Sequence, residues 1–338
     1  MTDIQSIEQL VKLFNHLPTG DRAADEASHS RNKALLKPPG SLGELENLVG
    51  WLAYWQKQSR PTLDKVRILI FAGNHGVTAE KVTPYDPSIT KKMVENFRNG
   101  NAAINQLAKN AQADLDVIEV NGLKPTRNFC YEPAMEELEF LEAIATGYHA
   151  VQPDTDLLVL GEMGIGNTTA AAALCTGLFG GDAEQWTGNG TTSNKEIIEH
   201  KKKAVRQAIE CHKAILDNPL QVARHLGGYE LAALLGAILA ARHLNIPVLL
   251  DGFVCTASVA PLYKLHNEGL DHARLGHLSA EKGHLLLAGH LNLYPLLALN
   301  MRLGEASGAA VAVPILRAAL SCYNGMITYQ EAGLPLPD

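Results

Sequence analysis

The sequence lacks the cysteine pairs from which disulfide frameworks and structural zinc sites are built. Its five cysteines are Cys130, Cys175, Cys211, Cys255 and Cys322, and no two of them form a Cys-x-x-Cys pair. An odd and dispersed set is typical of free thiols in a reducing compartment. The amino terminus has no basic stretch followed by an apolar one, so we expect no signal peptide and a cytoplasmic protein.

Long uncharged runs and aromatic residues are scarce as well. No apolar run reaches the roughly 18–20 residues that cross a membrane. Aromatic residues make up only 6% of the 338 residues, so stacking platforms for single-stranded nucleic acid are not expected. The net charge of −7 at pH 7 argues against general nucleic-acid binding. The composition therefore predicts a folded protein with no membrane span and no nucleic-acid partner.

Metal-binding spacing is missing from the histidine-rich segment 272–290. Its histidines are His272, His277, His284 and His290, and no two of them lie four residues apart. No His-Glu-x-x-His pattern occurs there either. Because helical zinc sites need such spacing, we predict no metal site.

A strand, a glycine-rich turn and a helix are predicted in succession over residues 156–180. Residues 157–160 are apolar without alternation, which is typical of a strand covered on both faces. Glycines follow at 161, 164 and 166, and Asn167 or Thr168 is expected to cap a helix over 170–178. Free N–H groups at the start of such a helix bind phosphate, which makes Gly164 to Thr168 a candidate phosphate site. An ordinary tight connection is the alternative.

This turn matches neither common nucleotide fingerprint in full. No Gly-Lys-Ser/Thr follows it, which excludes a Walker loop. After Gly164 and Gly166, Thr169 stands where the dinucleotide fingerprint has Gly or Ala. Glu162 lies directly before the turn, where a carboxylate suits a sugar hydroxyl better than a phosphate.

The remaining chain alternates helical and strand patterns. Short segments rich in β-forming residues predict strands at 66–72, 115–120 and 246–250. This alternation predicts an α/β fold with a mostly parallel, doubly wound sheet. A helix is expected from about 308 to 323, with Pro314 kinking or shortening it. The other expected helices cover residues 4–16, 21–36, 42–58, 89–97, 133–146, 194–216 and 227–241.

Several polar residues in the connections have two interpretations. The loop 37–43 is either a rigid connector or a segment folded over a pocket, because it holds two prolines and two glycines. His75 follows a predicted strand and is either a catalytic base or a residue that bonds the loop backbone. Lys201 belongs to a basic cluster that is either a solvated helix face or the source of a phosphate contact.

Five long motifs resemble, in order, those of the nicotinate-nucleotide–dimethylbenzimidazole phosphoribosyltransferase family. They are Lys-Pro-Pro-Gly-Ser-Leu-Gly at 37–43, Ala-Gly-Asn-His-Gly at 72–76, Gly-Glu-Met-Gly-Ile-Gly-Asn-Thr-Thr at 161–169, Leu-Asp-Gly-Phe at 250–253 and Arg-Leu-Gly-Glu-Ala-Ser-Gly-Ala at 302–309. The resemblance covers nearly the whole chain. It implies transfer of the phosphoribosyl group of nicotinate mononucleotide to 5,6-dimethylbenzimidazole. The products are α-ribazole 5′-phosphate, for the lower ligand of cobalamin, and nicotinate.

The resemblance also implies an architecture and a set of site residues. It implies a Rossmann-like domain over 61–304, a small helical domain from 1–60 and 305–338, and a homodimer. Glu305 is implied as the base that faces the benzimidazole, and Glu162 lies near the ribose. The implied phosphate site is Gly164, Gly166, Asn167 and Thr168 with Gly190, Thr191 and Lys201. The implied base pocket holds Met163, Leu303, Asn74, His75, Thr83 and Tyr85.

Two segments depart from the family pattern. The family has Gly-Thr-Gly and then acidic residues where this chain has Gly-Thr-Thr-Ser-Asn at 190–194. It has Val-Ser-x-Tyr/Phe-Pro where this chain has Val-Thr-Pro-Tyr-Asp-Pro at 82–87. The second segment adjoins the implied base pocket, so the acceptor base is open. Another benzimidazole, a purine or a phenol remains an alternative, as does a non-catalytic nucleotide-binding protein.

The chemistry of the implied transfer makes few demands on the protein. The pyridinium leaves as a neutral ring, so no general acid, metal or cofactor is required. Attack by one azole nitrogen makes the other nitrogen acidic, and one carboxylate suffices to take that proton. For Glu305 we expect burial to raise the pKa by more than a helix dipole lowers it.

Overall fold

A six-stranded sheet forms the centre of the computed structural model, which describes residues 4–190 and 192–336. Every neighbouring pair of strands is parallel, and the order is β2-β1-β3-β4-β5-β6. The switch in winding lies between β1 and β3, as in the flavodoxin-like variant of doubly wound sheets. The predicted α/β class is therefore confirmed. The strands are β1 Val66–Ala72, β2 Ala113–Glu119, β3 Leu157–Met163, β4 Val248–Leu250, β5 Ala273–His277 and β6 Pro295–Leu297.

The predicted strands are present, with two differences in extent and number. β1 has the predicted bounds, whereas β3 continues past residue 160 and carries Glu162 and Met163 at its carboxyl end. β5 and β6 were not predicted from the sequence. They are only five and three residues long and pair with the sheet through β4.

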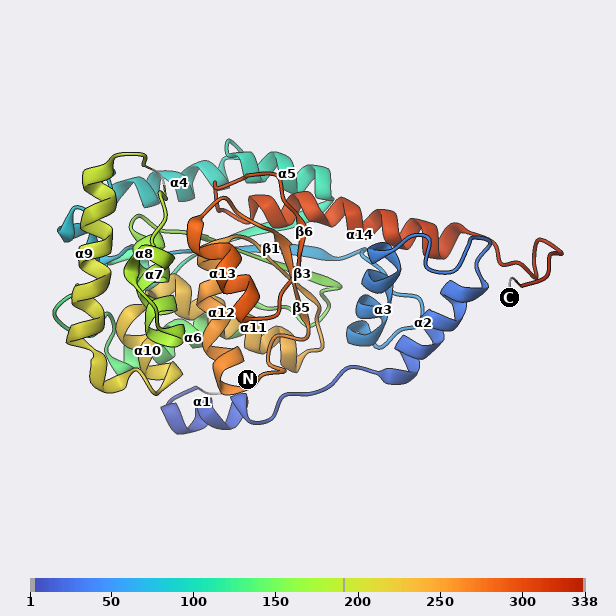
Figure 1. The fold of residues 1–338 in the computed structure, drawn as a ribbon, viewed down its shortest axis with the longest axis horizontal. Helices are drawn as coiled ribbons and strands as arrows, with labels where there is room; N and C mark the ends of the chain where they lie inside the picture. The colour runs from blue at the N-terminus through green and yellow to red at the C-terminus, as the bar shows by residue number, and fades with distance from the viewer. Residues whose placement is uncertain (1–3, 191, 337–338) are drawn as a thin grey trace.

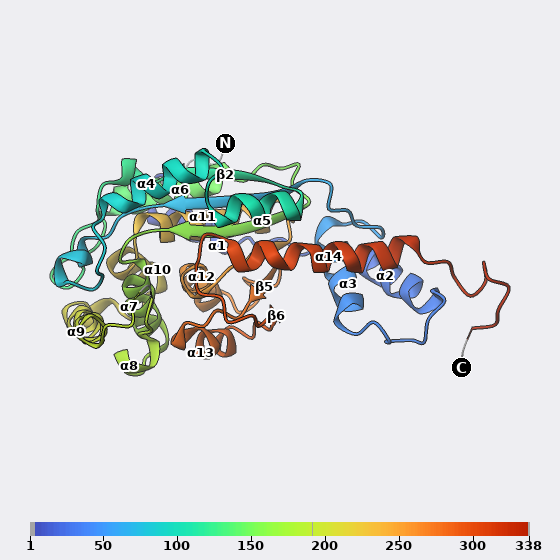
Figure 2. The same cartoon turned by 90° about the horizontal axis from the view of Figure 1, so that it is seen from above.

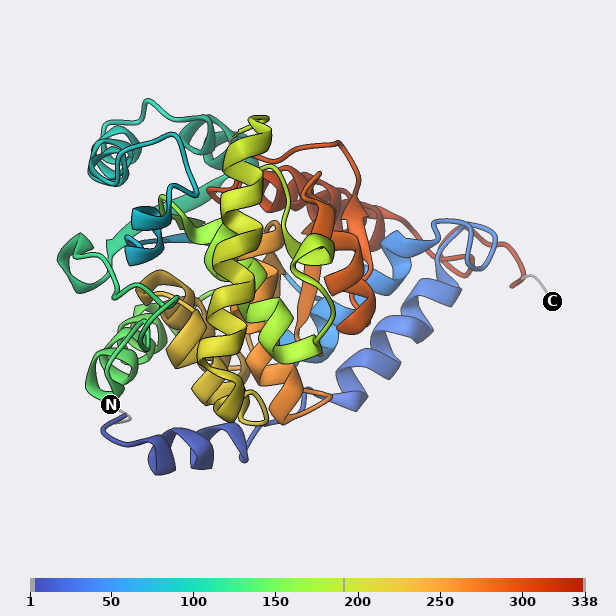
Figure 3. The same cartoon turned by 60° about the vertical axis from the view of Figure 1, so that its left-hand side comes forward.

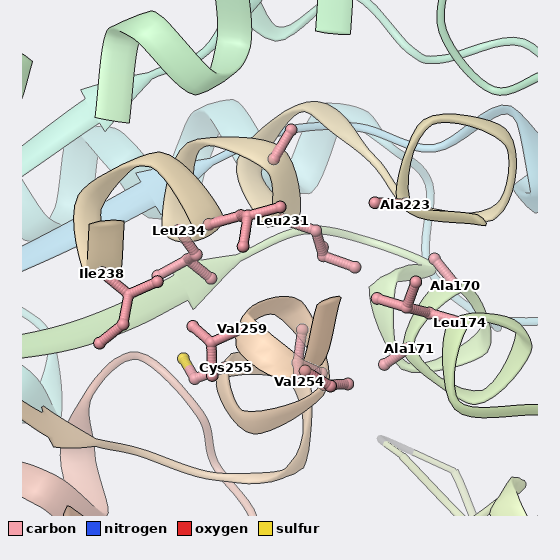
Figure 4. Packing of buried hydrophobic residues seen from close by; sticks show 14 of the residues in the cluster. Ala170, Ala171, Leu174, Ala223, Leu231, Leu234, Ile238, Val254, Cys255 and Val259 are labelled. Carbon is pink, nitrogen blue, oxygen red and sulfur yellow. The ribbon is translucent and has the colours of Figure 1, made fainter. Parts of the chain in front are cut away.

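Side chains alternate along the strands between two hydrophobic layers. On β3, Leu158 and Leu160 join one buried cluster, and Leu157 and Val159 join the other. Figure 4 shows the first layer, where Leu234 of α11 lies near Val259 of α12. The helices of this layer are α1 Ile7–Phe14, α6 Glu137–Ala150, α7 Asn167–Phe179, α10 Pro219–Leu226, α11 Tyr229–His243 and α12 Phe253–Leu265.

The second layer contains the last long helix, α14 Ser307–Gly325. Pro314 lies inside α14, and the helix continues past it to Gly325, so the expectation that this proline shortens the helix is wrong. The other helices of this layer are α3 Glu44–Gln56, α4 Ser88–Arg98 and α5 Ala103–Ala111. Three further helices pack outside α7 and α12: α8 Ala183–Trp186, α9 Lys195–Cys211 and α13 Lys282–His290.

A small helical layer extends from one end of the sheet (Figures 1 and 2). It consists of α2 Arg22–Ala34, α3 and the carboxyl-terminal half of α14, and α3 contacts both other helices. The Arg31 guanidinium donates hydrogen bonds to the backbone oxygens of Tyr323 and Met326. α1 lies elsewhere, at the edge of the first layer (Figure 3), where its Leu10 and Phe14 are buried. The domain boundaries at 60/61 and 304/305 stay a prediction.

Candidate active site

A cavity of about 330 Å³ lies at the carboxyl ends of the central strands. Open α/β sheets bind their ligands at this edge, close to the switch in winding. The walls come from the end of β3, from the residues after β4 and β5, from α4, and from the segment before α14. The lining residues are Tyr85, Ile89, Met93, Glu162, Met163, Gly164, Ile165, Asn167, Thr168, Gly190, Gly252, Phe253, Val254, His277, Ser279, Glu281, Arg302, Leu303, Gly304 and Glu305.

The cavity brings together most of the site residues named from the sequence. Those that line it are Glu305, Glu162, Met163, Gly164, Asn167, Thr168, Gly190, Leu303 and Tyr85. Gly166, Lys201, Asn74, His75 and Thr83 are not in its lining. Thr191 lies outside the described residues.

The glycine turn after β3 starts α7 differently from the sequence expectation. The residue that caps α7 is Gly166, with φ of +96°, and Asn167 is already the first helical residue. The Asn167 side-chain amide instead donates a hydrogen bond to the Glu162 carboxylate. The prediction that Asn167 or Thr168 caps the helix is therefore wrong, because β3 places a carboxylate within reach of the amide. The first N–H groups of α7 have no side-chain cap.

Lys201 lies directly behind this turn. Its side chain is buried, and its Nζ donates hydrogen bonds to the Asn189 backbone oxygen at 3.1 Å and to Thr168 Oγ1 at 3.4 Å. Burial lowers the pKa of Lys201, and the negative charge of Glu281 opposes that shift. Arg302 Nη1 donates to the Gly190 backbone oxygen at 2.8 Å. Two cations therefore hold the 189–190 loop beside the start of α7.

The polar residues after β1 are engaged with the protein itself. His75 is completely buried, and its Nε2 lies 2.6 Å from Oε1 of the equally buried Glu230. Asn74 donates to the Leu123 backbone oxygen and accepts from the Thr90 hydroxyl. Thr83 Oγ1 accepts from the Tyr85 backbone N–H. These residues shape the loops around the cavity without lining it, and His75 is not placed as a catalytic base there.

Burial makes weak acids of two carboxyl groups of the cavity, those of Glu305 and Glu162. Glu305 is 6% exposed, and burial, followed by the charge of Asp251, raises its pKa to about 7. Burial also raises the pKa of Glu162 to about 8, with contributions from Asp251 and Glu230 that the Asn167 hydrogen bond opposes. The pKa of Glu305 is therefore raised, as we expected from the sequence. Its backbone precedes α14 by two residues, so it does not belong to the first helical turn.

The backbone that carries Glu305 has an unusual conformation. Gly304, Glu305 and Ala306 have φ angles of +81°, +62° and +62°, so three consecutive residues are left-handed. Non-glycine residues rarely adopt this region. A Cβ atom on Gly161 of β3 would lie 2.5 Å from the Ala306 backbone nitrogen, so the glycine is what lets this turn approach the strand. Left-handed residues that persist in a fold cluster at functional sites.

The sequence did not identify several lining residues as part of the site, among them His277, Ser279, Glu281 and Arg302. His277 ends β5 and Ser279 follows it, so the missed signal is the end of a strand too short to detect. The Ser279 backbone N–H donates to Nδ1 of buried His284, whose Nε2 lies 3.1 Å from Thr256 Oγ1. Burial lowers the pKa of His284 to about 3, so this histidine is neutral.

The described part of the chain holds neither a cluster of metal ligands nor a membrane-spanning helix. In residues 4–190 and 192–336, no group of three or more His, Cys, Asp or Glu side chains is arranged to hold a metal ion. Within the same ranges, no helix is long and apolar enough to cross a membrane.

Comparisons with known proteins agree with the resemblance seen in the motifs. Residues 17–334 match a family model described as phosphoribosyltransferase. A nicotinate-nucleotide–dimethylbenzimidazole phosphoribosyltransferase of Mesorhizobium japonicum is 52% identical over 330 residues, which are 98% of each chain. One from Cereibacter sphaeroides is 49% identical over 95% of each chain. The crystal structure of such an enzyme from Thermus thermophilus is 37% identical with a TM-score of 0.85, over 93% of this chain and 99% of that one.

Proposed function

Because this chain belongs to the nicotinate-nucleotide–dimethylbenzimidazole phosphoribosyltransferase family, we propose that its cavity transfers phosphoribosyl from nicotinate mononucleotide to 5,6-dimethylbenzimidazole. The products are α-ribazole 5′-phosphate, the nucleotide of the cobalamin lower ligand, and nicotinate. One observation carries the proposal. A single cavity combines a phosphate-binding helix start with a buried carboxyl group whose pKa of about 7 suits proton transfer.

The phosphate is bound at the start of α7. Gly164 and Thr168 line the cavity, and the first turn of α7, which has no side-chain cap, presents the positive end of the helix dipole. Lys201 and Arg302 add positive charge beside Gly190. Glu162 lies at the carboxyl end of β3, and its pKa near 8 leaves it mostly protonated at neutral pH. A protonated carboxyl group can donate a hydrogen bond to a ribose hydroxyl and can also accept one from it.

The acceptor base lies against the apolar wall of the cavity. Met163 and Leu303 line one part of it, and Ile89 and Met93 of α4 line another. A flat, largely apolar heterocycle loses water-exposed surface in such a pocket, which favours its binding. Tyr85, from the segment that departs from the family pattern, is also in the lining, so this side of the pocket bears on the choice of base.

Glu305 acts as the base of the transfer. One azole nitrogen attacks C1 of the ribose while the C–N bond to the pyridinium breaks, and nicotinate leaves with the bonding electron pair. The new ribosylated azolium loses its N–H proton to the Glu305 carboxylate. A single displacement predicts inversion at the ribose carbon. Holding both reactants in one cavity supplies much of the acceleration, because the loss of translational freedom is met on binding.

A direct assay tests the proposal. Nicotinate mononucleotide and 5,6-dimethylbenzimidazole are mixed with the protein, and nicotinate release is followed by chromatography. Glu305→Gln should remove most turnover and leave nucleotide binding intact, and unchanged turnover would remove Glu305 from the role of base. A panel of benzimidazoles, purines and phenols, ranked by kcat/KM, identifies the acceptor. Saturable binding of both ligands without nicotinate release would instead favour a non-catalytic binding protein.

We also propose that the protein is a homodimer and that it is cytoplasmic. In the segment before α14, the side chains of Tyr294, Leu299 and Leu303 are 82%, 55% and 53% exposed, and such apolar exposure is typical of contact surfaces. All five cysteines, which lie in the described part of the chain, are free, in keeping with a reducing compartment. Light scattering during size-exclusion chromatography tests the oligomeric state.

A further inference from the structure

Asp251 lies behind the cavity, and the proposed reaction gives it no role. It follows the last residue of β4 and is completely buried. The three residues after it, Gly252 to Val254, line the cavity, whereas Asp251 itself does not. A buried aspartate at the end of a central strand is costly unless something offsets the loss of water.

The contacts of Asp251 join three parts of the cavity wall. Its Oδ1 accepts a hydrogen bond of 2.9 Å from the backbone N–H of Ala309, in the first turn of α14. The same oxygen lies 3.4 Å from Nε2 of His277, at the end of β5. Its Oδ2 is buried and has no hydrogen-bond partner among the described residues. One carboxylate therefore connects the ends of β4 and β5 to the start of α14.

The segment held in this way is the left-handed turn that carries Glu305. Gly304, Glu305 and Ala306 all have positive φ angles, and this conformation persists only where the surroundings fix it. On one side Ala306 rests against Gly161. On the other side, the Ala309 N–H bond to Asp251 anchors the helix that follows. Without that anchor, the first turn of α14 has no side-chain cap to hold it.

Asp251 also places a negative charge behind Glu305. Its charge raises the pKa of Glu305, second to burial, and it raises the pKa of Glu162 as well. The other titratable or charged side chains of the cavity wall are Glu162 from β3, Tyr85 before α4, His277 from β5, Glu281 before α13 and Arg302 beside Glu305. Apart from burial, Asp251 is the contributor identified for Glu305.

We propose that Asp251 is the positioning residue of Glu305. Its hydrogen bond to Ala309 fixes the turn that carries the base, and its charge makes Glu305 a stronger proton acceptor. This inference rests on the proposed function, in which Glu305 takes the azolium proton. It adds a requirement for a second carboxylate that touches neither substrate.

Asp251→Asn separates charge from shape, because its amide oxygen still accepts the Ala309 hydrogen bond. We expect the acid limb of the kcat/KM profile to move down by about one pH unit. KM for nicotinate mononucleotide should stay within about twofold, because the phosphate site is unchanged. Asp251→Ala also loses the hydrogen bond and should lower kcat by about a further tenfold. Equal kcat values for Asp251→Asn and Asp251→Ala would show that the hydrogen bond from Asp251 to Ala309 does not position Glu305.

Glu281→Gln is the matched control. It removes another buried carboxyl group of the same cavity wall, one that does not contribute to the pKa of Glu305. Its acid limb should coincide with that of the wild type, whatever happens to KM. An acid limb that stays at the wild-type pH in Asp251→Asn would overturn the inference, while nicotinate release by the wild type keeps the proposed function intact.

A second variant and a second measurement cover the remaining outcomes. If Asp251→Asn does not fold, Asp251→Ser provides a smaller, neutral acceptor for Ala309, with the same expected shift of the acid limb.

The pH dependence of stability, measured by urea unfolding, is a second test that requires no enzymatic activity. Without the Asp251 charge, Glu162 and Glu305 hold their protons less tightly, so the loss of stability between pH 5 and 9 should be smaller than in the wild type. An unchanged dependence counts against the inference even if no nicotinate is released.

Discussion

His75 and Glu230 form a completely buried pair, with Nε2 and Oε1 2.6 Å apart. Glycines surround this pair. A Cβ atom on Gly73 or on Gly164 would lie 2.4 Å from a Glu230 carboxylate oxygen, and one on Gly228 would lie 2.2 Å from the His75 ring. The carboxylate therefore lies directly under the glycine turn that follows β3. The pair supports the proposed phosphate loop from below.

Breaking this pair should destabilise the fold more than removing it. His75→Leu leaves the Glu230 carboxylate buried without a hydrogen-bond donor, which we expect to cost about 3 kcal/mol in the free energy of unfolding. Glu230→Gln should cost a similar amount. The double variant should cost clearly less than the sum, as measured by urea unfolding. Additive losses would show that the two side chains are not coupled.

Gly161 is predicted to be the most sensitive glycine of the cavity. In Gly161→Ala, the new methyl group would lie 2.5 Å from the Ala306 nitrogen, so the left-handed turn must move away from β3. We expect a loss of about 1–3 kcal/mol in stability. Nicotinate release should fall by about 100-fold, because shifts of about 1 Å in catalytic geometry cost that much.

Gly289→Ala is the control for this substitution. Gly289 lies inside α13, and a Cβ atom there meets nothing within 4 Å. Its effect should be slightly stabilising, because alanine is the better helix former. If Gly161→Ala is as active as Gly289→Ala, the close approach of β3 to the turn does not position Glu305.

The pH dependence of stability should reveal the proton on Glu162. Burial raises the pKa of this carboxyl group from 4.5 to about 8, so the folded protein keeps a proton that the unfolded chain releases. That contribution is full below about pH 4.5 and is lost as the pH rises to about 8. Glu162→Gln stays neutral throughout. From pH 5 to pH 9 its stability relative to that of the wild type should rise by about 4 kcal/mol.

Urea unfolding at pH 5, 7 and 9 measures this difference. Glu305 has a raised pKa of about 7, so the Glu162→Gln variant should still lose some stability over the lower part of this pH range. Parallel stability curves for the wild type and Glu162→Gln would mean that Glu162 is ionised in the fold.

Lys201 is predicted to act on the phosphate. Its ammonium group lies between the Asn189 backbone oxygen and the Thr168 hydroxyl, at the start of α7. Lys201→Met should raise KM for nicotinate mononucleotide by about 10- to 100-fold, as expected for a lost hydrogen bond to a charged group. Nicotinate riboside has no phosphate, so its kinetics should be nearly the same in both proteins. Lys195→Met, at an exposed position of the same helix, is the matched control.

The fold was largely predictable because its central strands carry their own signal. The continuous apolar runs 68–72 in β1 and 157–160 in β3 indicate strands covered on both faces, as they are. β5 and β6 carry no such signal. β5 contains Arg274, Gly276 and His277 within five residues, and β6 begins with a proline. They are strands because β4 aligns them, through pairs such as Leu250 with Leu275.

The site was predictable only in part, for a related reason. Glu162, Gly164 and Thr168 lie together in the sequence, so the glycine turn identifies them. Asp251 and His277 meet because two short parallel strands end at the same edge. Likewise, nothing near Gly161 indicates that Ala306 lies against it. Contacts between residues distant in sequence follow from strand register, which local patterns do not contain.

α14 makes Glu305, the proposed base, dependent on the far end of the molecule. Its first turn follows Glu305, and its last turns are held by α3 and by the Arg31 guanidinium, about 28 Å away along a 19-residue helix. A rigid helix transmits displacement along its length. An engineer who trims the α2–α3 region to obtain a minimal catalyst would thus displace Glu305, the proposed base, from a distance, with every cavity side chain still present.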